Sequence, residues 1–294
     1  MSGLKAIRRR ISSVRNTRQI TRAMKLVSAA KLRRAQEWAE NGARYSRHLN
    51  RVVSEISAEL EGELQHPLLE NRSSVKVRRV IVVAGERGLC GAYNTNIIKA
   101  VQYQEFAPGV RTEVVPVGRR AVSSAKRLGW SIVDEYDNLP EDASRWPVEA
   151  MARKLMKDYA EKRCDEVVVY FTRFVSALTQ QVTREVILPL GNVATSESAE
   201  QSEAGAHTGG ISGFSPTPEV IVEQLIPMLI KTKLYEAALQ ARASEHAARM
   251  TAMDSATKNA GDLIDRLRLF YNRARQSAIT KELMDIIGGA EAIK

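Results

Sequence analysis

The stretch LKAIRRRISSVRNTRQITRAMKLVSAAKLRRAQ, residues 4–36, decides the fold of this chain. Its apolar residues recur at alternating spacings of three and four, beginning with Leu4, Ile7, Ile11 and Val14. This is the a/d pattern of a helix that packs lengthwise along another helix. Polar residues interrupt the pattern near Arg18, and we expect the apolar seam to resume at Ile20, Met24 and Val27.

The helical pattern continues well beyond this stretch. A third run keeps the same spacing through Trp38, Gly42, Tyr45, Leu49, Val52 and Ile56. The first proline is Pro67, and a helix of about 57 residues would be roughly 85 Å long. Residues 1–34 hold no Asp or Glu, which is also typical of organellar transit peptides. Because the apolar pattern runs on to about residue 60, we predict an N-terminal coiled-coil helix over 1–62.

The C-terminal third has the same character, and we predict a second coiled-coil helix over 218–294. Between Met228 and Ile287 there is no proline and only one glycine, Gly261. Pro227 is expected near the helix start, where proline is tolerated. Alanine recurs throughout 237–260, and small side chains allow two helices to approach closely. We therefore expect the two long helices to pack antiparallel.

The middle of the chain alternates strand-like and helix-like segments. The expected strands are 80–84, 114–117, 167–171 and 181–188, and the expected helices are 97–106, 120–128 and 147–162. This alternation predicts a Rossmann-like α/β domain over 75–190 with a largely parallel sheet. Residues 191–213 are rich in Ser, Ala, Glu and Gly and predict a flexible linker. The expected fold class is α/β with long helices, in which an antiparallel coiled coil accompanies the central domain.

The stretch VIVVAGERGLCGAYNTN, residues 80–96, lies where a nucleotide-binding protein would hold a phosphate. Its glycines are three residues apart, so the dinucleotide fingerprint G-x-G-x-x-G fails, and no Lys-Ser or Lys-Thr completes a P-loop. Glu86 would also place a carboxylate beside the phosphate. We predict a tight structural turn and no cofactor. Its key residues are Gly85, Arg87, Gly88, Cys90 and Gly91.

No catalytic or metal site is expected from the remaining motifs. The four histidines are scattered without zinc spacing, and no G-x-S-x-G elbow occurs. Cys90 has no neighbouring histidine, so we interpret it as a thiol without a catalytic role. With Cys164 it makes no disulfide framework, which favours a reducing compartment.

Charge is distributed unevenly between the two predicted helices. Residues 1–51 hold fourteen Lys or Arg against two Glu, whereas residues 219–294 hold eleven basic and ten acidic residues. The basic helix could contact DNA phosphates, anionic lipid or the acidic loops of a protein. No apolar run approaches the roughly 18 residues of a transmembrane helix, so no direct membrane span is expected.

Three stretches resemble the gamma subunit of F-type ATP synthases. They are residues 4–36, the turn GERGLCGAYN, and ARMTAMDSATKNAGDLIDRLRLFYNRARQSAITKELMDIIGGAEA at 248–292. The resemblance implies a non-catalytic central shaft that couples ion flow through the c-ring to ATP synthesis or hydrolysis. It implies alpha, beta and epsilon subunits and the c-ring as partners. It also implies a peripheral position on the cytoplasmic face of a bacterial cell membrane, and no nucleotide in the glycine turn.

The resemblance also assigns candidate contact residues. In YNRARQSAIT, the residues that would meet a loop of the beta subunits are Asn272, Arg275, Gln276 and Thr280. In QITRAMK, Met24 and Lys25 would pass the acidic levers of the beta subunits. A basic shaft face would be formed by Arg8, Arg9 and Arg10. Gly85 and Glu86 replace the family's usual Ser and Asp, and Glu86 preserves the charge. The cysteine pair of photosynthetic relatives is missing, so thiol control is not expected.

Three alternatives compete with this interpretation. A basic coiled coil could bind nucleic acid, with a steep salt dependence, but the resemblance predicts no nucleic-acid partner. A central-stalk subunit of a vacuolar-type motor is disfavoured, because those stalks generally lack an α/β insert. An enzyme that uses the α/β domain is disfavoured by the broken glycine pattern.

Overall fold

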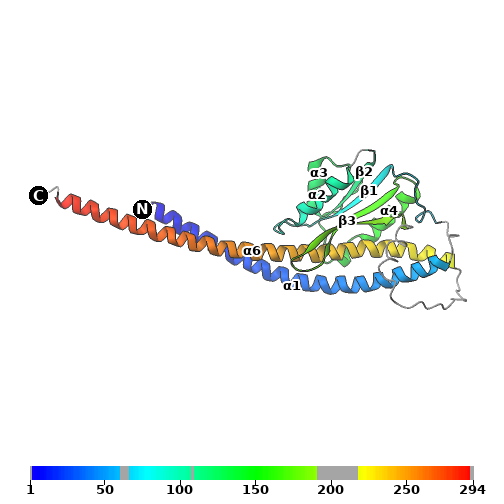
Figure 1. Ribbon diagram of the computed structural model, residues 1–294, viewed down its shortest axis with the longest axis horizontal. Coiled ribbons are helices and arrows are strands. Elements are labelled where there is room, and N and C mark those ends of the chain that lie inside the picture. The colour runs from blue at the N-terminus through cyan, green and yellow to red at the C-terminus, as the bar shows by residue number, and fades with distance from the viewer. Residues whose placement is uncertain (1, 60–65, 107–108, 191–217, 292–294) are drawn as a thin grey trace. The chain divides into compact units, whose positions relative to one another are not determined.

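The computed structural model describes residues 2–59, 66–106, 109–190 and 218–291. Two long helices, α1 (Ser2–Glu59) and α6 (Pro218–Glu291), flank a compact α/β region in the sequence (Figure 1). The chain divides into two compact units. Residues 1–30 and 249–294 form a helical unit, and residues 31–248 form a sheet unit.

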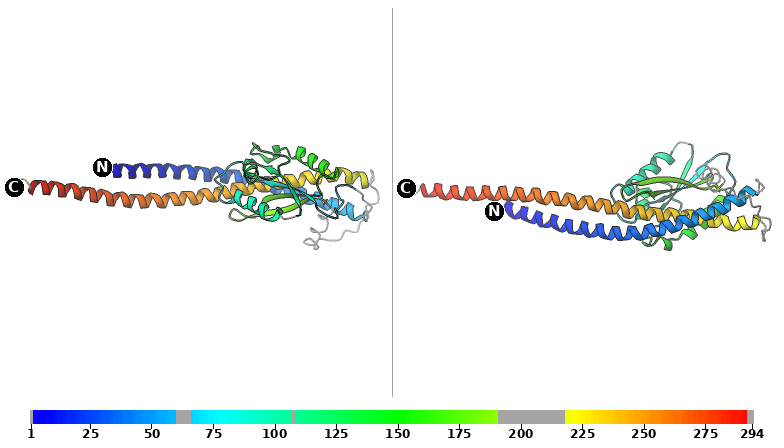
Figure 2. Two further views of the ribbon diagram at one scale, coloured as in Figure 1. Left: turned by 90° about the horizontal axis from the view of Figure 1, so that it is seen from above. Right: turned by 60° about the horizontal axis from the view of Figure 1, so that its bottom comes forward.

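In the helical unit, α1 and α6 lie antiparallel, side by side in both views of Figure 2. The Thr21 hydroxyl lies 2.8 Å from the Thr257 hydroxyl, and Lys25 Nζ lies 2.7 Å from Asp254 Oδ1. Nearer the N-terminus, Arg8 donates a 2.8 Å hydrogen bond to the Tyr271 hydroxyl. These pairs confirm the predicted antiparallel coiled coil.

The predicted interruption of the seam near Arg18, with a restart at Ile20, Met24 and Val27, is wrong. Thr21 and Ser28 are buried, whereas Ile20 and Val27 are 60% and 53% exposed. The three-four spacing of the first run continues unbroken through positions 18, 21, 25 and 28, which polar residues occupy. Two of these polar side chains, Thr21 and Lys25, meet polar partners on α6. The apolar neighbours point outward instead.

In the sheet unit the same spacing continues, so the expected third run is corrected at Trp38 and Tyr45, whereas Gly42 and Leu49 lie on the seam as expected. The buried seam residues of α1 are Leu32, Ala35, Ala39, Ser46 and Leu49. Trp38 and Tyr45 are exposed, because they lie one position off the seam. A Cβ built on Gly42 would lie 2.9 Å from Leu239 Cδ1, so the helices approach too closely for bulky side chains. The side chains of Val52 and Ile56 lie outside the described part.

The sheet has four strands in the order β2-β1-β3-β4. The strands are β1 (Val77–Val83), β2 (Arg111–Val117), β3 (Glu166–Phe174) and β4 (Gln180–Leu188). β1 pairs parallel with β2 and β3, whereas β4 pairs antiparallel with β3. The predicted α/β class with a largely parallel sheet is therefore confirmed.

Alternating side chains of the strands give the sheet two apolar faces. On one face, Val80 and Val82 pack with α2 (Tyr93–Glu105) and α3 (Arg119–Leu128). On the other face, Ile81 and Val83 share a core with α4 (Val148–Ala160) and with α1 and α6 of the same unit. A short 3-10 helix, η1 (Ala143–Arg145), precedes α4. Strands β1, β2 and β3 are thus largely buried on both sides, whereas β4 is only partly buried.

The expected position of Pro227 near the start of the C-terminal helix is wrong. Helix α6 begins at Pro218, so Pro227 lies inside it. A proline there removes one helix hydrogen bond, while the nearby residues Ile226 and Ile230 are buried in the core. The predicted linker at 191–213 lies outside the described residues. None of the described helices combines the length and the apolar composition needed to cross a lipid bilayer.

Candidate functional site

The side chain of Asn94 contributes hydrogen bonds to the glycine turn between β1 and α2. Its Oδ1 accepts a 2.8 Å hydrogen bond from the Gly85 amide, and its Nδ2 lies 3.1 Å from Cys90 Sγ. The backbone is left-handed at Leu89 (φ 61°) and at Gly91 (φ 58°). An asparagine in the first turn of α2 therefore fixes a compact loop whose shape depends on positive φ angles.

Several backbone donors around this turn are engaged by groups of the protein itself. The Glu86 carboxylate accepts hydrogen bonds from the amides of Arg119, at the start of α3, and Leu139. The Gly85 carbonyl accepts from the Arg120 amide at 3.0 Å. A Cβ on Gly118 would lie 2.2 Å from the Ala84 carbonyl oxygen, so the two loops are in contact. These contacts support the prediction of a structural turn.

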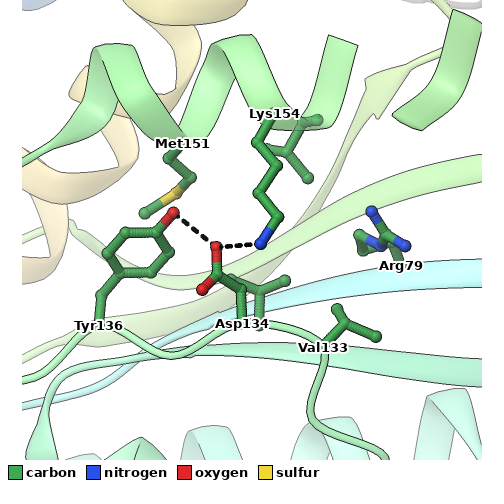
Figure 3. Close-up of a pocket in the computed structure, with 8 residues that line it drawn as sticks. Arg79, Val133, Asp134, Tyr136, Met151 and Lys154 are labelled. Atoms are coloured by element: carbon green, nitrogen blue, oxygen red, sulfur yellow. Dashed lines mark hydrogen bonds and ion pairs between the residues drawn. The ribbon is translucent and has the colours of Figure 1, made fainter. Parts of the chain in front are cut away.

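A small cavity lies beside the sheet, between β2 and α4 (Figure 3). Its volume is about 10 Å³, enough for one water molecule and far too small for a nucleotide. On its wall, Asp134 accepts from Lys154 Nζ and from the Tyr136 hydroxyl, each at 2.8 Å. Burial alone would raise the pKa of Asp134, but these two hydrogen bonds lower it overall. The carboxylate is therefore held as an ion pair.

The candidate contact residues on α6 all face solvent. Their helical spacing places them on one side of the helix: Asn272, Arg275, Gln276 and Thr280 are exposed. The Thr280 hydroxyl donates a 3.0 Å hydrogen bond to the Gln276 carbonyl oxygen. Among the described residues, Arg275 makes no ion pair. Its guanidinium is therefore available for forked hydrogen bonds to a carboxylate or carbonyl group of a partner.

The candidates on α1 are placed differently from one another. Met24 is half-buried, and Lys25 is engaged within the chain by Asp254. Hydrogen bonds from Lys25 and Lys258 lower the pKa of Asp254. Lys25 thus contributes to the helix seam, and its expected contact with a partner stays a prediction.

The three arginines of the predicted basic face also differ in their contacts. Arg8 lies over the Tyr271 ring, with its guanidinium carbon 5.7 Å from the ring centroid. Arg9 and Arg10 are exposed to solvent. Arg8 therefore ties the two helices together, and its two neighbours present the positive charge.

Sequence reasoning missed a set of outward apolar side chains in the helical unit. The exposed members are Ile20, Leu26, Val27, Leu269, Phe270, Ile279, Leu283, Met284, Ile286 and Ile287. Following the three-four spacing without interruption would have placed Ile20 and Val27 outside. Such a concentration of exposed apolar side chains is typical of a surface that a protein partner covers.

Comparison with known proteins assigns the chain to a family. The family model described as ATP synthase matches residues 3–293. The ATP synthase gamma chain of Heliobacterium modesticaldum is 41% identical, and that of Trichlorobacter lovleyi is 39% identical. In both cases the similarity covers 100% of this chain and 100% of the relative.

Solved structures agree on the fold. A rotor structure of the Euglena gracilis mitochondrial ATP synthase superposes with a TM-score of 0.66 at 19% identity, covering 95% of this chain and 99% of that chain. A central stalk and c-ring structure from Tetrahymena thermophila gives a TM-score of 0.62 at 21% identity, covering 81% and 99%. With full-length relatives at about 40% identity, this chain belongs to the family of ATP synthase gamma chains.

Proposed function

We propose that this chain is the rotating shaft of an F-type ATP synthase, coupling ion flow through a c-ring to ATP synthesis or hydrolysis at an alpha/beta ring. The observation that carries the proposal is the row of exposed apolar side chains near the end of α6, including Leu283, Met284 and Ile287. We expect the apolar surface of a partner protein to surround this part of α6, because exposing apolar side chains to water is unfavourable.

The proposed shaft acts on the beta subunits by biasing their conformations. An asymmetric helix pair presents different side chains to each of three equivalent subunits, and a contact shifts an equilibrium only through its differential affinity. The exposed face with Arg275 and Gln276 would supply one such contact, and the charge of Arg9 and Arg10 another. Rotation then moves the bias from one subunit to the next.

The remaining partners follow from the same proposal. The α/β domain would contact the epsilon subunit and the c-ring, and the complex would lie peripherally on the cytoplasmic face of a bacterial cell membrane. The chain itself would carry no catalytic residue and no cofactor. The engaged donors around Glu86 support a turn that does not bind nucleotide.

Reconstitution tests the proposal directly. Alpha and beta subunits from the same organism are mixed with and without this chain, and assembly and Mg-ATP hydrolysis are measured. We expect a stable, hydrolytically active complex that contains the chain. The double variant Arg275→Ala and Gln276→Ala should assemble normally but synthesise less ATP in the complete enzyme. A chain that does not assemble with competent alpha and beta subunits would contradict the proposal. Unchanged ATP synthesis by the double variant would show that Arg275 and Gln276 are not needed for coupling.

A further inference from the structure

The segment 139–146 carries a set of polar contacts that extend beyond the α/β domain. It is anchored within that domain, since Ala143 and Trp146 are buried in the core shared with the sheet, and the Trp146 Nε1 to Pro140 carbonyl hydrogen bond of 2.9 Å closes the segment on itself. The Leu139 amide is held by Glu86, near the start of α3. The segment is therefore a firm part of the α/β domain.

The same segment holds α6 through Arg242. This arginine is buried, and its guanidinium donates to the Pro140 carbonyl oxygen and to Glu245, each at 2.8 Å. Its guanidinium carbon lies 5.1 Å from the centroid of the Trp146 ring. Charge-assisted hydrogen bonds and a stacked guanidinium are directional, so they set the orientation of α6 as well as its distance.

Glu141 extends this arrangement to α1. Its carboxylate accepts a 2.6 Å hydrogen bond from Lys31 Nζ and lies 3.8 Å from His246 Nε2 on α6. Burial would raise the pKa of Glu141, but Lys31, His246 and Arg242 lower it overall. The carboxylate is thus ionised at neutral pH and touches side chains of both long helices.

Directional contacts add to the apolar packing between the two helices. In the sheet unit, the seam of α1 has the small residues Ala35, Ala39 and Gly42 between Leu32 and Leu49. Small side chains permit close approach but offer little resistance to sliding or rotation. A carboxylate on the α/β domain that accepts a hydrogen bond from Lys31 on α1 and lies beside His246 on α6 resists both motions.

We infer that Glu141 is a positioning residue that locks the α/β domain in rotation to both helices of the shaft, together with Lys31 and Arg242. The inference rests on the proposed rotary function. It means that torque applied to the α/β domain reaches α1 through Glu141 as well as through α6.

The test uses Glu141→Gln in the full chain, assembled into the complete complex. Tyr103 is 83% exposed on α2, so Tyr103→Cys gives an attachment point for a rotation probe, and both native cysteines are buried. With the alpha/beta ring immobilised, angular fluctuations of the probe report torsional stiffness. We expect Glu141→Gln to lose stiffness while unloaded ATP hydrolysis keeps the wild-type rate.

A matched control comes from the pair Lys231–Glu149, at 3.1 Å, which joins the α/β domain to α6 alone. Its side chains are 40% and 64% exposed, close to the 37% and 53% of Lys31 and Glu141. Glu149→Gln should leave stiffness at the wild-type value. Lys31→Met should reproduce Glu141→Gln, and Lys31→Arg should preserve stiffness. Equal stiffness in Glu141→Gln and Glu149→Gln would overturn the inference.

Hydrogen exchange on the isolated full chain separates this inference from the proposed function. Glu141→Gln should raise exchange in residues 143–146 and in α1 around Lys31 by roughly two- to fivefold, and Glu149→Gln should not raise it there. A wild-type complex that hydrolyses ATP without rotating would contradict the proposed function. Unchanged exchange in Glu141→Gln would contradict the lock itself.

Discussion

The two units of the chain differ in how polar and apolar side chains are divided between buried and exposed positions. In the sheet unit, α6 buries Ile226, Ile230 and Leu234 in a core shared with the sheet. In the helical unit, the seam holds Thr21, Lys25 and Ser28, and apolar side chains such as Leu283 face outward. Most of the buried apolar core lies in the sheet unit, although side chains such as Trp38 and Leu178 are exposed there. The exposed apolar side chains of the helical unit are of the kind that a protein partner covers.

Truncating one apolar side chain in each unit gives the largest expected effect. Ile230 is fully buried, so Ile230→Ala should lower the free energy of unfolding by about 2–5 kcal/mol. Leu283 is 56% exposed, and Leu283→Ala should change it by less than about 0.5 kcal/mol in the isolated chain. Urea unfolding measures both, and Leu283→Ala should weaken assembly with the alpha/beta ring. Similar losses of stability in both variants would break the comparison.

The two helix glycines provide a test of intermediate size. Gly42→Leu inserts a side chain where Leu239 Cδ1 already lies 2.9 Å from the Cβ position, so a loss of about 1–3 kcal/mol is expected. Gly261→Ala in the helical unit has only Arg18 atoms near, at 3.8–3.9 Å. It should stabilise the helix by about 0.5–1 kcal/mol. Thermal unfolding followed by circular dichroism compares them, and a gain from Gly42→Leu would show that the seam is looser than described.

Acid sensitivity gives the smallest expected difference. Glu105 is buried between Tyr170, Arg184 and Arg78. Burial would raise the pKa of this carboxyl, but the hydrogen bonds from Tyr170 and Arg184 lower it overall. A lowered folded-state pKa gives stability that is present above the unfolded pKa, about 4.3, and is lost as the pH falls through the folded value.

The comparable carboxylate in the helical unit is Asp254, whose pKa is lowered by hydrogen bonds from Lys25 and Lys258. Its ion pairs should also lose their stabilising effect as the pH falls, but solvent and salt screen these pairs and make the effect small. Urea midpoints between pH 6 and pH 3 should therefore fall less steeply in Glu105→Gln than in the wild type. Asp254→Asn should alter the slope only slightly, and only at low salt. A larger effect from Asp254→Asn would reverse the comparison.

Much of this fold follows from sequence patterns, and the errors have a common physical cause. Long stretches without proline, and alternating apolar strands and helices, are local signals, so both long helices and the sheet were predictable. The phase of α1 was not, because the apolar residue at each step was assumed to face inward. In the structure several seam positions hold small or polar residues, such as Ala39 and Thr21, and Trp38 and Tyr45 lie one position off the seam.

The candidate site residues also differ in how far the sequence could predict them. Exposure of Arg275 and Gln276 agrees with a role in partner contact, but only the resemblance to a family pointed to them. Lys25 was expected to face a partner, and its bond to Asp254 could not be anticipated without the register of the two helices. The three-way contact of Glu141 depends on a loop, where no periodic pattern exists to predict a position.

The pairing of Arg8 with Tyr271 has a consequence for how the chain folds. These residues are 263 positions apart, so the helix pair at that level closes a loop that contains the entire α/β domain. Loop closure over such a span is entropically costly, whereas the hairpin of β3 and β4 forms from neighbouring segments. The α/β domain should therefore fold first and shorten the loop. On the ribosome, the basic N-terminal helix must wait unpaired until almost the whole chain has been made.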